Sequence, residues 1–191
     1  MVVLFIDTCN NYLGVGLAKD DKLVYKKEYD AFKRQSELLA KEVDDCLKEN
    51  KVKPSDINKI VVTNGPGSYT GIRIGLTLAK VMATTLNIEL VLISSLHAIA
   101  GKKENVLALI DARSKRAYYG VYDKGKCVKA DSVDYIDNIN IEGYTLIGDT
   151  QLFNRNTIEY SIIENMFELY KDIAPIKDPR SANAIYLKDA L

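Results

Sequence analysis

The chain opens with a continuous apolar run that ends in an acid, Val2–Asp7. Two further apolar segments follow across short polar turns, Tyr12–Lys19 and Lys22–Asp30. Runs of this length with polar turns between them predict three strands joined as hairpins. Leucine and valine then recur at helical spacing from Ser36 to about Asn50, which predicts a helix with Ser36 as its N-cap.

Strand and helix patterns alternate after this first helix. A β-branched run at Lys59–Thr63 leads through a glycine-rich turn to a helix over about Thr70–Leu86, and a strand follows at Glu89–Ile93. The order β-β-β-α-β-α-β is typical of a ribonuclease-H-like half, which is a mixed sheet with helices on its faces.

The second half of the chain begins by repeating the first. A shift of 104 residues without a gap places Ile6-Asp7 on Ile110-Asp111 and Gly16-Leu17 on Gly120-Val121. Both copies read strand, polar turn, strand, turn, strand. We therefore expect an α/β fold with a duplicated ribonuclease-H-like unit, as in actin-like ATPases and sugar kinases.

We place the N-terminal ribonuclease-H-like subdomain at residues 1–101 and a smaller, truncated C-terminal subdomain of the same type at residues 102–191. The C-terminal part is expected to hold a strand at Tyr144–Ile147, a helix at Thr157–Lys171 and a terminal helix at Ser181–Leu191.

Composition narrows the range of functions. With 26 basic and 26 acidic residues among 191, the formal net charge is zero, so no overall field attracts the chain to nucleic acid or to an anionic membrane. Apolar stretches stop well short of the roughly 20 residues that a membrane span needs, and no basic leader precedes the first strand, so we expect a cytoplasmic protein.

The cysteines and the histidine argue against a metal centre. Cys9, Cys46 and Cys127 are widely separated, which favours reduced core thiols over disulfides or a zinc site. The only histidine, His97, provides no second imidazole for a metal cluster. We therefore expect no bound metal and no cofactor.

Two turns stand where an actin-like protein would hold the phosphates of a nucleotide. They contain Asp7 and Thr8 in the first copy and Asp111 and Arg113 in the second, and neither turn contains glycine. Side chains there occupy the space that a phosphate needs, so these are degenerate phosphate-loop positions. The two aspartates are expected to cap their own turns by accepting backbone N–H bonds, with metal ligation as the alternative.

A nuclease of the same fold would need several carboxylates around two metal ions. Asp7 with Glu37 or Glu42 could supply two of them, but the end of the fourth strand at Thr63–Gly65 contains no acid. A metal-dependent nuclease or ATPase therefore remains the alternative function.

The glycine-rich segment between strand and helix consists of Gly65, Pro66, Gly67, Ser68, Tyr69, Thr70 and Gly71. It matches neither the dinucleotide-binding fingerprint nor the P-loop, which would place a lysine after the last glycine. We interpret it as a rigid contact loop, with an anion site or a plain turn as the alternatives.

The helix after this loop carries a stripe of small residues, Gly71, Gly75, Ala79 and Ala83, flanked by apolar residues such as Ile72. The apolar arc is wider than one sheet face buries. The stripe therefore either packs inside the monomer or forms a subunit interface. The basic turn Arg113–Arg116 is either solvated or contacts a carboxylate or an RNA phosphate.

The segment Asn64–Gly75 reads N-G-P-G-S-Y-T-G-I-R-I-G. Together with Phe5–Thr8, Ser94–Leu96 and Ile110–Arg113, it resembles the TsaB (YeaZ) family over the whole chain. Two departures are Tyr69, where phenylalanine is commoner, and Gln35, where histidine is frequent. The C-terminal half is also shorter than in many members.

The resemblance implies a bacterial subunit of the machinery that forms N6-threonylcarbamoyladenosine beside the anticodon of tRNAs reading ANN codons. In that machinery the paralogue TsaD performs the transfer with a metal held by two histidines, and the ATPase TsaE joins the assembly. The resemblance implies a scaffold that is not an enzyme by itself, despite older descriptions of the wider family as glycoproteases.

The resemblance also implies the partners. Family members pair through helices of the first half, as homodimers when alone or as a heterodimer with TsaD, and reach tRNA only through the complex. It favours a partner interface formed by the loop Gly65–Gly71 with Ile72, Gly75, Ala79 and Ala83.

Overall fold

The computed structural model describes residues 1–187, and in it the three hairpin-joined strands form one side of a five-stranded sheet. The order is β3-β2-β1-β4-β5, with β1 antiparallel to β2 and parallel to β4. The strands are β1 (Val2–Asp7), β2 (Tyr12–Lys19), β3 (Lys22–Asp30), β4 (Lys59–Thr63) and β5 (Glu89–Ile93).

The second sheet repeats this arrangement with four strands in the order β8-β7-β6-β9. Its strands are β6 (Val106–Asp111), β7 (Arg116–Asp123), β8 (Lys126–Tyr135) and β9 (Thr145–Gly148). The strands β6, β7 and β8 each begin 104 residues after β1, β2 and β3. The structure thus confirms the duplicated α/β fold. The first hairpin of the second copy is one residue tighter, because Asp111 pairs with Ala117 whereas Asp7 pairs with Gly14.

In the described part of the chain, four α-helices accompany the sheets: α1 (Gln35–Glu49), α2 (Tyr69–Leu86), α3 (Ser95–Ala100) and α4 (Ile162–Leu169). Short 3-10 turns occur at Pro54–Asp56, Ile136–Asn138, Thr150–Phe153, Tyr170–Asp172 and Pro179–Ser181. None of the helices in this described range is long and apolar enough to cross a membrane.

The predicted helices need three corrections. Ser36 is not the N-cap of α1, because the helix starts at Gln35 and Arg34 precedes it. The helix predicted at Thr157–Lys171 shortens to α4, because Ser161 caps it by accepting the N–H of Glu164. The predicted terminal helix is absent from 182–187, and its last residues, 188–191, lie outside the described range.

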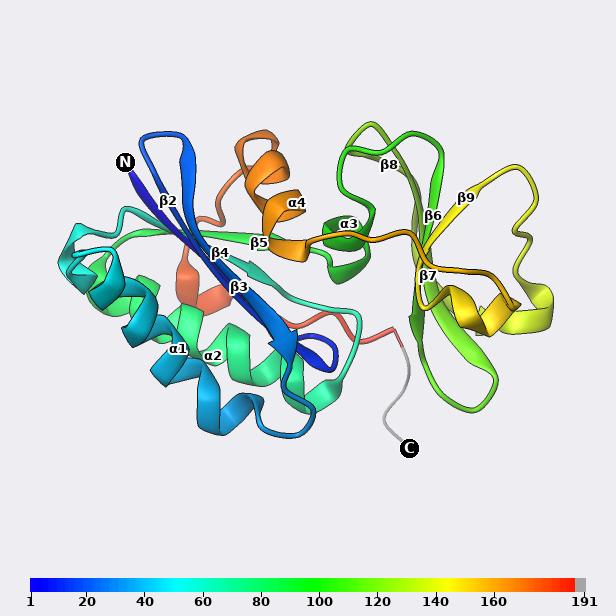
Figure 1. Ribbon diagram of the computed structural model, residues 1–191, viewed down its shortest axis with the longest axis horizontal. Helices are drawn as coiled ribbons and strands as arrows, with labels where there is room; N and C mark the ends of the chain where they lie inside the picture. The colour runs from blue at the N-terminus through cyan, green and yellow to red at the C-terminus, as the bar shows by residue number, and fades with distance from the viewer. Residues whose placement is uncertain (188–191) are drawn as a thin grey trace.

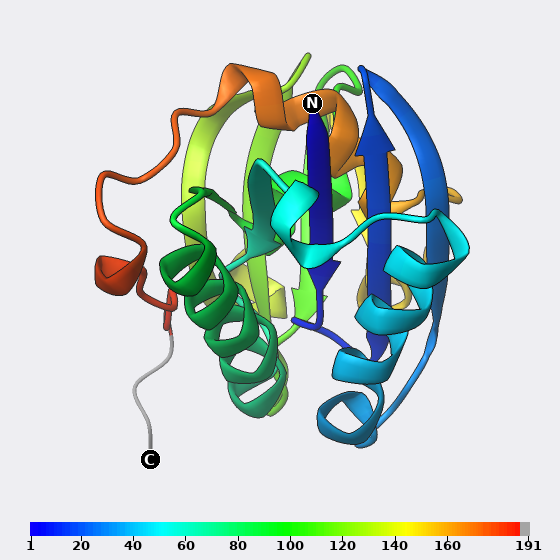
Figure 2. The same ribbon diagram turned by 90° about the vertical axis from the view of Figure 1, so that its left-hand side faces the viewer.

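The two sheets and their helices form layers around a shared centre. In β1, Leu4 and Ile6 point toward α1 and α2, while Val3 and Phe5 point toward α3, α4 and the second sheet. Figure 2 shows α1 and α2 together on the outer face of the first sheet. Within residues 1–187, 3-10 segments and loops, and no α-helix, cover the outer face of the second sheet around Leu107.

The C-terminal part of the chain crosses back over the first half. Helix α4 packs against β1, β2 and β3, and the N–H of Ile176 donates to the carbonyl oxygen of Leu90 on β5 at 2.9 Å. Figure 1 shows this return as the orange and red segments. The subdomain boundary at residue 101 therefore stays a prediction about chain segments, since the layers of the fold share residues from both.

A pair of contacts made by His97 connects α3 with the second sheet. His97 on α3 stacks on Tyr122 of β7, with ring centroids 4.7 Å apart, and its Nε2 lies 2.9 Å from the carbonyl oxygen of Gly125.

Cys9 and Cys46 are buried as expected, but Cys127 is exposed, because β8 is an edge strand whose first residues face outward.

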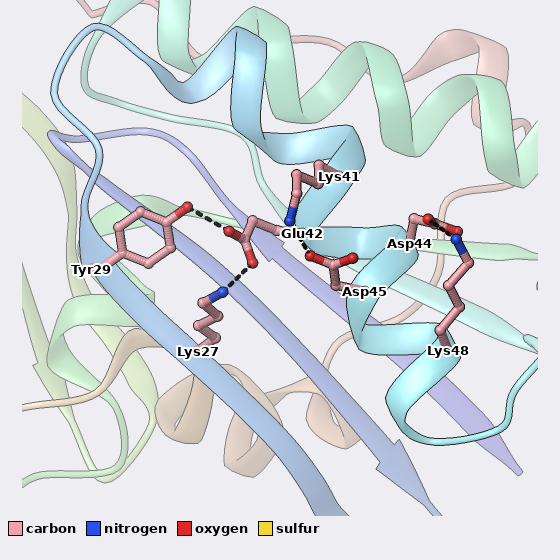
Figure 3. Close-up of polar contacts among 7 residues, drawn as sticks. All are labelled: Lys27, Tyr29, Lys41, Glu42, Asp44, Asp45 and Lys48. Atoms are coloured by element: carbon pink, nitrogen blue, oxygen red, sulfur yellow. Dashed lines mark hydrogen bonds and ion pairs between the residues drawn. The ribbon is translucent and has the colours of Figure 1, made fainter.

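Helix α1 is fastened to β3 by a carboxylate. The Glu42 side chain is only 7% exposed, and it accepts hydrogen bonds from Lys27 Nζ at 2.6 Å and from the Tyr29 hydroxyl at 2.8 Å (Figure 3). Burial alone would raise the pKa of Glu42, but these two donors outweigh it and hold the pKa below 4.5. The stabilisation is therefore complete above that pH and is lost as the pH falls through the lower folded value.

The replacement Glu42→Gln should lower the free energy of unfolding at pH 7 by about 2 kcal/mol, because it removes a charge-assisted pair from a buried position. The matched control is Asp44→Asn, which removes an exposed pair with Lys48 on the same helix and should change little. Urea unfolding of both variants measures the difference. An equal loss of unfolding free energy in the two variants would contradict the prediction that the Glu42 pair stabilises the fold more than the exposed pair does.

Candidate functional site

At the first of the two turns, Asp7 is buried at the end of β1. Its Oδ1 accepts from the Thr63 hydroxyl at 2.5 Å and from the N–H of Cys9 at 3.3 Å. Its Oδ2 is buried and has no hydrogen-bond partner. Burial raises the pKa of Asp7 to about 6, even though both hydrogen bonds act in the opposite direction.

The next residue, Thr8, inserts into the first turns of α2. Its hydroxyl donates to the carbonyl oxygen of Gly71 at 2.7 Å and accepts from the N–H of Gly75 at 3.1 Å. The turn is tied down further because the N–H of Ser68 donates to the carbonyl oxygen of Cys9 at 2.6 Å. Hydrogen bonds from Thr8 and Cys9 therefore fix this turn to α2 and to the loop before it.

The second turn closes on itself. The carboxylate of Asp111 accepts from the N–H of Arg113 at 2.7 Å and from its guanidinium at 3.2 Å. Arg113, Ser114 and Lys115 all have positive φ values, between 54° and 62°, so the backbone curls tightly. The prediction that Asp7 and Asp111 cap their own turns is confirmed.

A cleft of about 510 Å³ lies between the two turns. Aromatic rings from both halves line it, including Tyr12, Phe32 and Tyr160, and the carboxyl groups of Asp111 and Asp149 share the lining. Arg113 also lines the cleft and pairs with Asp111, so the charges of these two side chains offset each other.

The carboxylates of the nuclease alternative do not gather at Asp7. Glu37 is exposed on α1, and Glu42 is engaged by Lys27 and Tyr29. Within residues 1–187, no group of three or more His, Cys, Asp or Glu side chains has a geometry that could hold a metal ion.

The small-residue stripe of α2 packs inside the monomer, against the first sheet and the turn at Thr8, and its part in a partner interface stays a prediction. A Cβ atom on Gly71 would lie 2.1 Å from the carbonyl oxygen of Thr8, and one on Gly75 would lie 2.5 Å from its hydroxyl oxygen. Ile72, Ala79 and Ala83 are buried as well. Gly71 and Gly75 leave the space in which the turn at Thr8 approaches α2 closely.

The glycine-rich loop divides into a buried and an exposed part. Gly65 and Pro66 are buried, Gly67 is half-buried, and Ser68, Tyr69 and Thr70 are exposed. The Ser68 side chain caps α2 by accepting the N–H of Gly71 at 3.2 Å. Contact of the exposed part with a partner stays a prediction.

A surface that the sequence analysis missed lies between α1 and α2, on the side away from the sheet. It is a groove of about 600 Å³, which we call the α1/α2 groove. Its lining comes from Ser36, Leu39 and Ala40 of α1 and from Tyr69, Thr70, Arg73, Ile74, Thr77, Leu78 and Val81 of α2. Figure 2 shows the two helices side by side.

The α1/α2 groove leaves large apolar groups in contact with solvent. Val81 is 57% exposed and Tyr69 is 54% exposed, although both belong to a regular helix of an apolar sequence. The sequence signal for this surface was the width of the apolar arc of α2, since one side of the arc covers the sheet and the other is left over.

Replacing Asp7 by asparagine should stabilise the protein in a pH-dependent way. The cost of ionising buried Asp7 starts as the pH rises above 3.8 and is complete above about 6. Asp7→Asn should therefore raise the free energy of unfolding by about 1–3 kcal/mol at pH 8 and by much less at pH 4. Urea unfolding at both values measures this, with exposed Asp137→Asn as the control. A pH-independent effect would contradict the burial of an ionisable Asp7.

The replacement Gly75→Ala should destabilise the protein, although alanine normally favours a helix over glycine by about 1 kcal/mol. The new Cβ would collide with the Thr8 hydroxyl, and we expect a loss of about 1–3 kcal/mol. Thr77→Ala, at an exposed position of the same helix, should leave the midpoint of thermal unfolding nearly unchanged. A stabilised Gly75→Ala variant would show that Thr8 does not constrain α2.

Comparisons with known proteins agree with this architecture. A family model described as "TsaD: tRNA N6-adenosine threonylcarbamoyltransferase" matches residues 29–162. The TsaB protein of Bacillus subtilis is 40% identical over 128 residues, which cover 64% of this chain and 55% of that protein. The TsaB protein of Buchnera aphidicola subsp. Schizaphis graminum is 24% identical over 91% of both chains.

Among solved structures, YeaZ from Pseudomonas aeruginosa superposes with a TM-score of 0.82 at 20% identity, covering 97% of this chain and 99% of that one. The aligned part of the present chain thus spans about half the length of the Bacillus subtilis relative, whereas the Pseudomonas structure shares its whole fold. The chain belongs to the tRNA N6-adenosine threonylcarbamoyltransferase family, and within it to the TsaB (YeaZ) group.

Proposed function

We propose that this chain takes part in the biosynthesis of N6-threonylcarbamoyladenosine in tRNA, as a scaffold subunit that binds and activates the catalytic paralogue TsaD. The names of the relatives and the description of the family support the pathway. One observation supports the scaffold role above the others: an exposed apolar groove belongs to a chain whose two phosphate-loop turns are closed.

The closed turns support a subunit that performs no transfer chemistry of its own. In the first turn, Thr8 hydrogen-bonds to α2 and Asp7 is buried beneath it. In the second turn, Arg113 hydrogen-bonds to the carboxylate of Asp111. A nucleotide would have to break these hydrogen bonds and expose an ionisable buried group before its phosphates could approach the backbone.

The α1/α2 groove is the surface that we assign to the paralogue. Its apolar helical lining suits the corresponding helices of a protein with the same fold, because ridges of one helix pair pack into the grooves of another. Pairing of two equivalent surfaces also gives a homodimer when the paralogue is absent. TsaE and tRNA join through the complex in the cytoplasm, which agrees with the zero net charge of the isolated chain.

An ATPase or metal-dependent nuclease is the alternative function, and the geometry disfavours it. Calorimetry with Mg-ATP separates the two. The scaffold proposal expects no stoichiometric binding by the purified chain, and stoichiometric binding would favour the alternative.

The replacement Val81→Asp should greatly weaken binding to TsaD. Modification of the tRNA should be lost as a result. Val81 is 57% exposed at the rim of the groove, so the fold tolerates aspartate there, but a charge buried in an apolar interface is costly. We expect at least a 100-fold weaker complex in sedimentation experiments, and no threonylcarbamoylation when the variant is mixed with TsaD, TsaE, donor and ATP.

The matched control is Val128→Asp, which changes a 65% exposed valine on β8 of the second sheet. This variant should bind TsaD and support modification like the unchanged chain. An intact complex with the Val81 variant would show that TsaD binds elsewhere.

A further inference from the structure

The last described residues of the chain, 182–187, run in an extended conformation along the loop that precedes α2. The N–H of Ile185 donates to the carbonyl oxygen of Asn64 at 2.7 Å, and the Asn64 side chain donates to the carbonyl oxygen of Asn183 at 3.1 Å. Asn64 thus grips the segment on both sides of residue 184, much as a neighbouring strand would. Figure 1 shows the red segment reaching this place beside α2.

The loop is shaped to receive this segment. A Cβ atom on Gly65 would lie 2.6 Å from the carbonyl oxygen of Ile185, so the backbones approach each other only because residue 65 is glycine. On α2 itself, Lys80 Nζ donates to the carbonyl oxygen of Ala182 at 2.9 Å. We call residues 182–187 the strap.

The strap reaches the α1/α2 groove through one aromatic ring. Tyr186 packs on Tyr69, with ring centroids 5.1 Å apart, and Tyr69 lines the groove. The Arg73 guanidinium lies 5.1 Å from the centroid of the same Tyr69 ring and donates to its hydroxyl at 2.7 Å. Tyr69 is therefore shared between the strap and the surface that we assign to a partner.

The strap buries little of its own side-chain surface. Tyr186 is 48% exposed, Asn183 is exposed, and Ala184 and Ile185 are half-buried, so Ala182 is its one buried residue. Segments with few buried apolar contacts open at low free-energy cost. Displacement would free the ring of Tyr69 and the carbonyl oxygen of Asn64 for a partner.

We propose that the strap competes with a protein partner for Tyr69, so that docking of an apolar helical face in the α1/α2 groove displaces residues 182–187 from the loop. The inference rests on the proposed function, since it assigns a regulator to the same surface. In the free chain, the packing of the strap on Tyr69 lowers the affinity for the partner. In the complex, the partner takes the place of the strap against Tyr69.

The test uses the full chain with Tyr186→Ala and measures its affinity for the TsaD paralogue by calorimetry. Loss of one aromatic stack should tighten the complex by about 3- to 10-fold, because the partner no longer displaces Tyr186 from Tyr69. Tyr186→Phe keeps the ring and should bind like the unchanged chain. Tyr144→Ala, which removes an exposed tyrosine from the second half, should also leave the affinity unchanged.

Hydrogen exchange gives a second readout in the unchanged chain. The amide of Ile185 should exchange faster in the complex than in the free chain, because partner binding breaks its bond to Asn64. Unchanged or weaker binding by Tyr186→Ala, or slower exchange at Ile185 in the complex, would overturn the competition. Failure of both the unchanged chain and Tyr186→Ala to bind TsaD would contradict the proposed function and the strap together. Binding by both with equal affinity would contradict the strap alone.

Discussion

The contact between Thr8 and the first turns of α2 is the constraint on which much of the structure depends. One hydroxyl group bonds to both Gly71 and Gly75, so the turn after β1 is fixed to a helix that starts more than sixty residues later. This contact requires glycine at two helical positions and brings α2 close to the turn after β1. The side of α2 that faces away from this contact lines the α1/α2 groove.

Much of the fold could be predicted from local patterns. Short apolar runs separated by polar turns predicted both sets of hairpins. The shift that aligns Asp7 with Asp111 also aligns the observed strands. Local patterns failed where tertiary contacts decide. Ser36 is a good N-cap residue, yet α1 begins one residue earlier, and the chain after Ser181 follows the loop at Asn64 instead of forming a helix.

The candidate site, too, could be predicted only in part from local sequence patterns. Glycine and alanine at every fourth position of α2 indicate close approach of another backbone, but they do not say whether that backbone belongs to the same chain. Here it is the turn at Thr8. The exposed surface is marked instead by residues such as Val81 and Tyr69, which are ordinary helix residues by type and become informative only when their exposure is known. The capping roles of Asp7 and Asp111, by contrast, are local and were predictable.

The unequal cover of the two sheets limits how copies of this fold assemble. Within the described residues, a pair of long helices lies over the outer face of the first sheet, while 3-10 turns and loops cover that of the second. A subunit that binds an equivalent copy through one surface has no further surface of that kind exposed once the pair has formed. On the proposed pairing through the α1/α2 groove, an assembly of this duplicated fold would therefore end at a pair instead of growing into a filament.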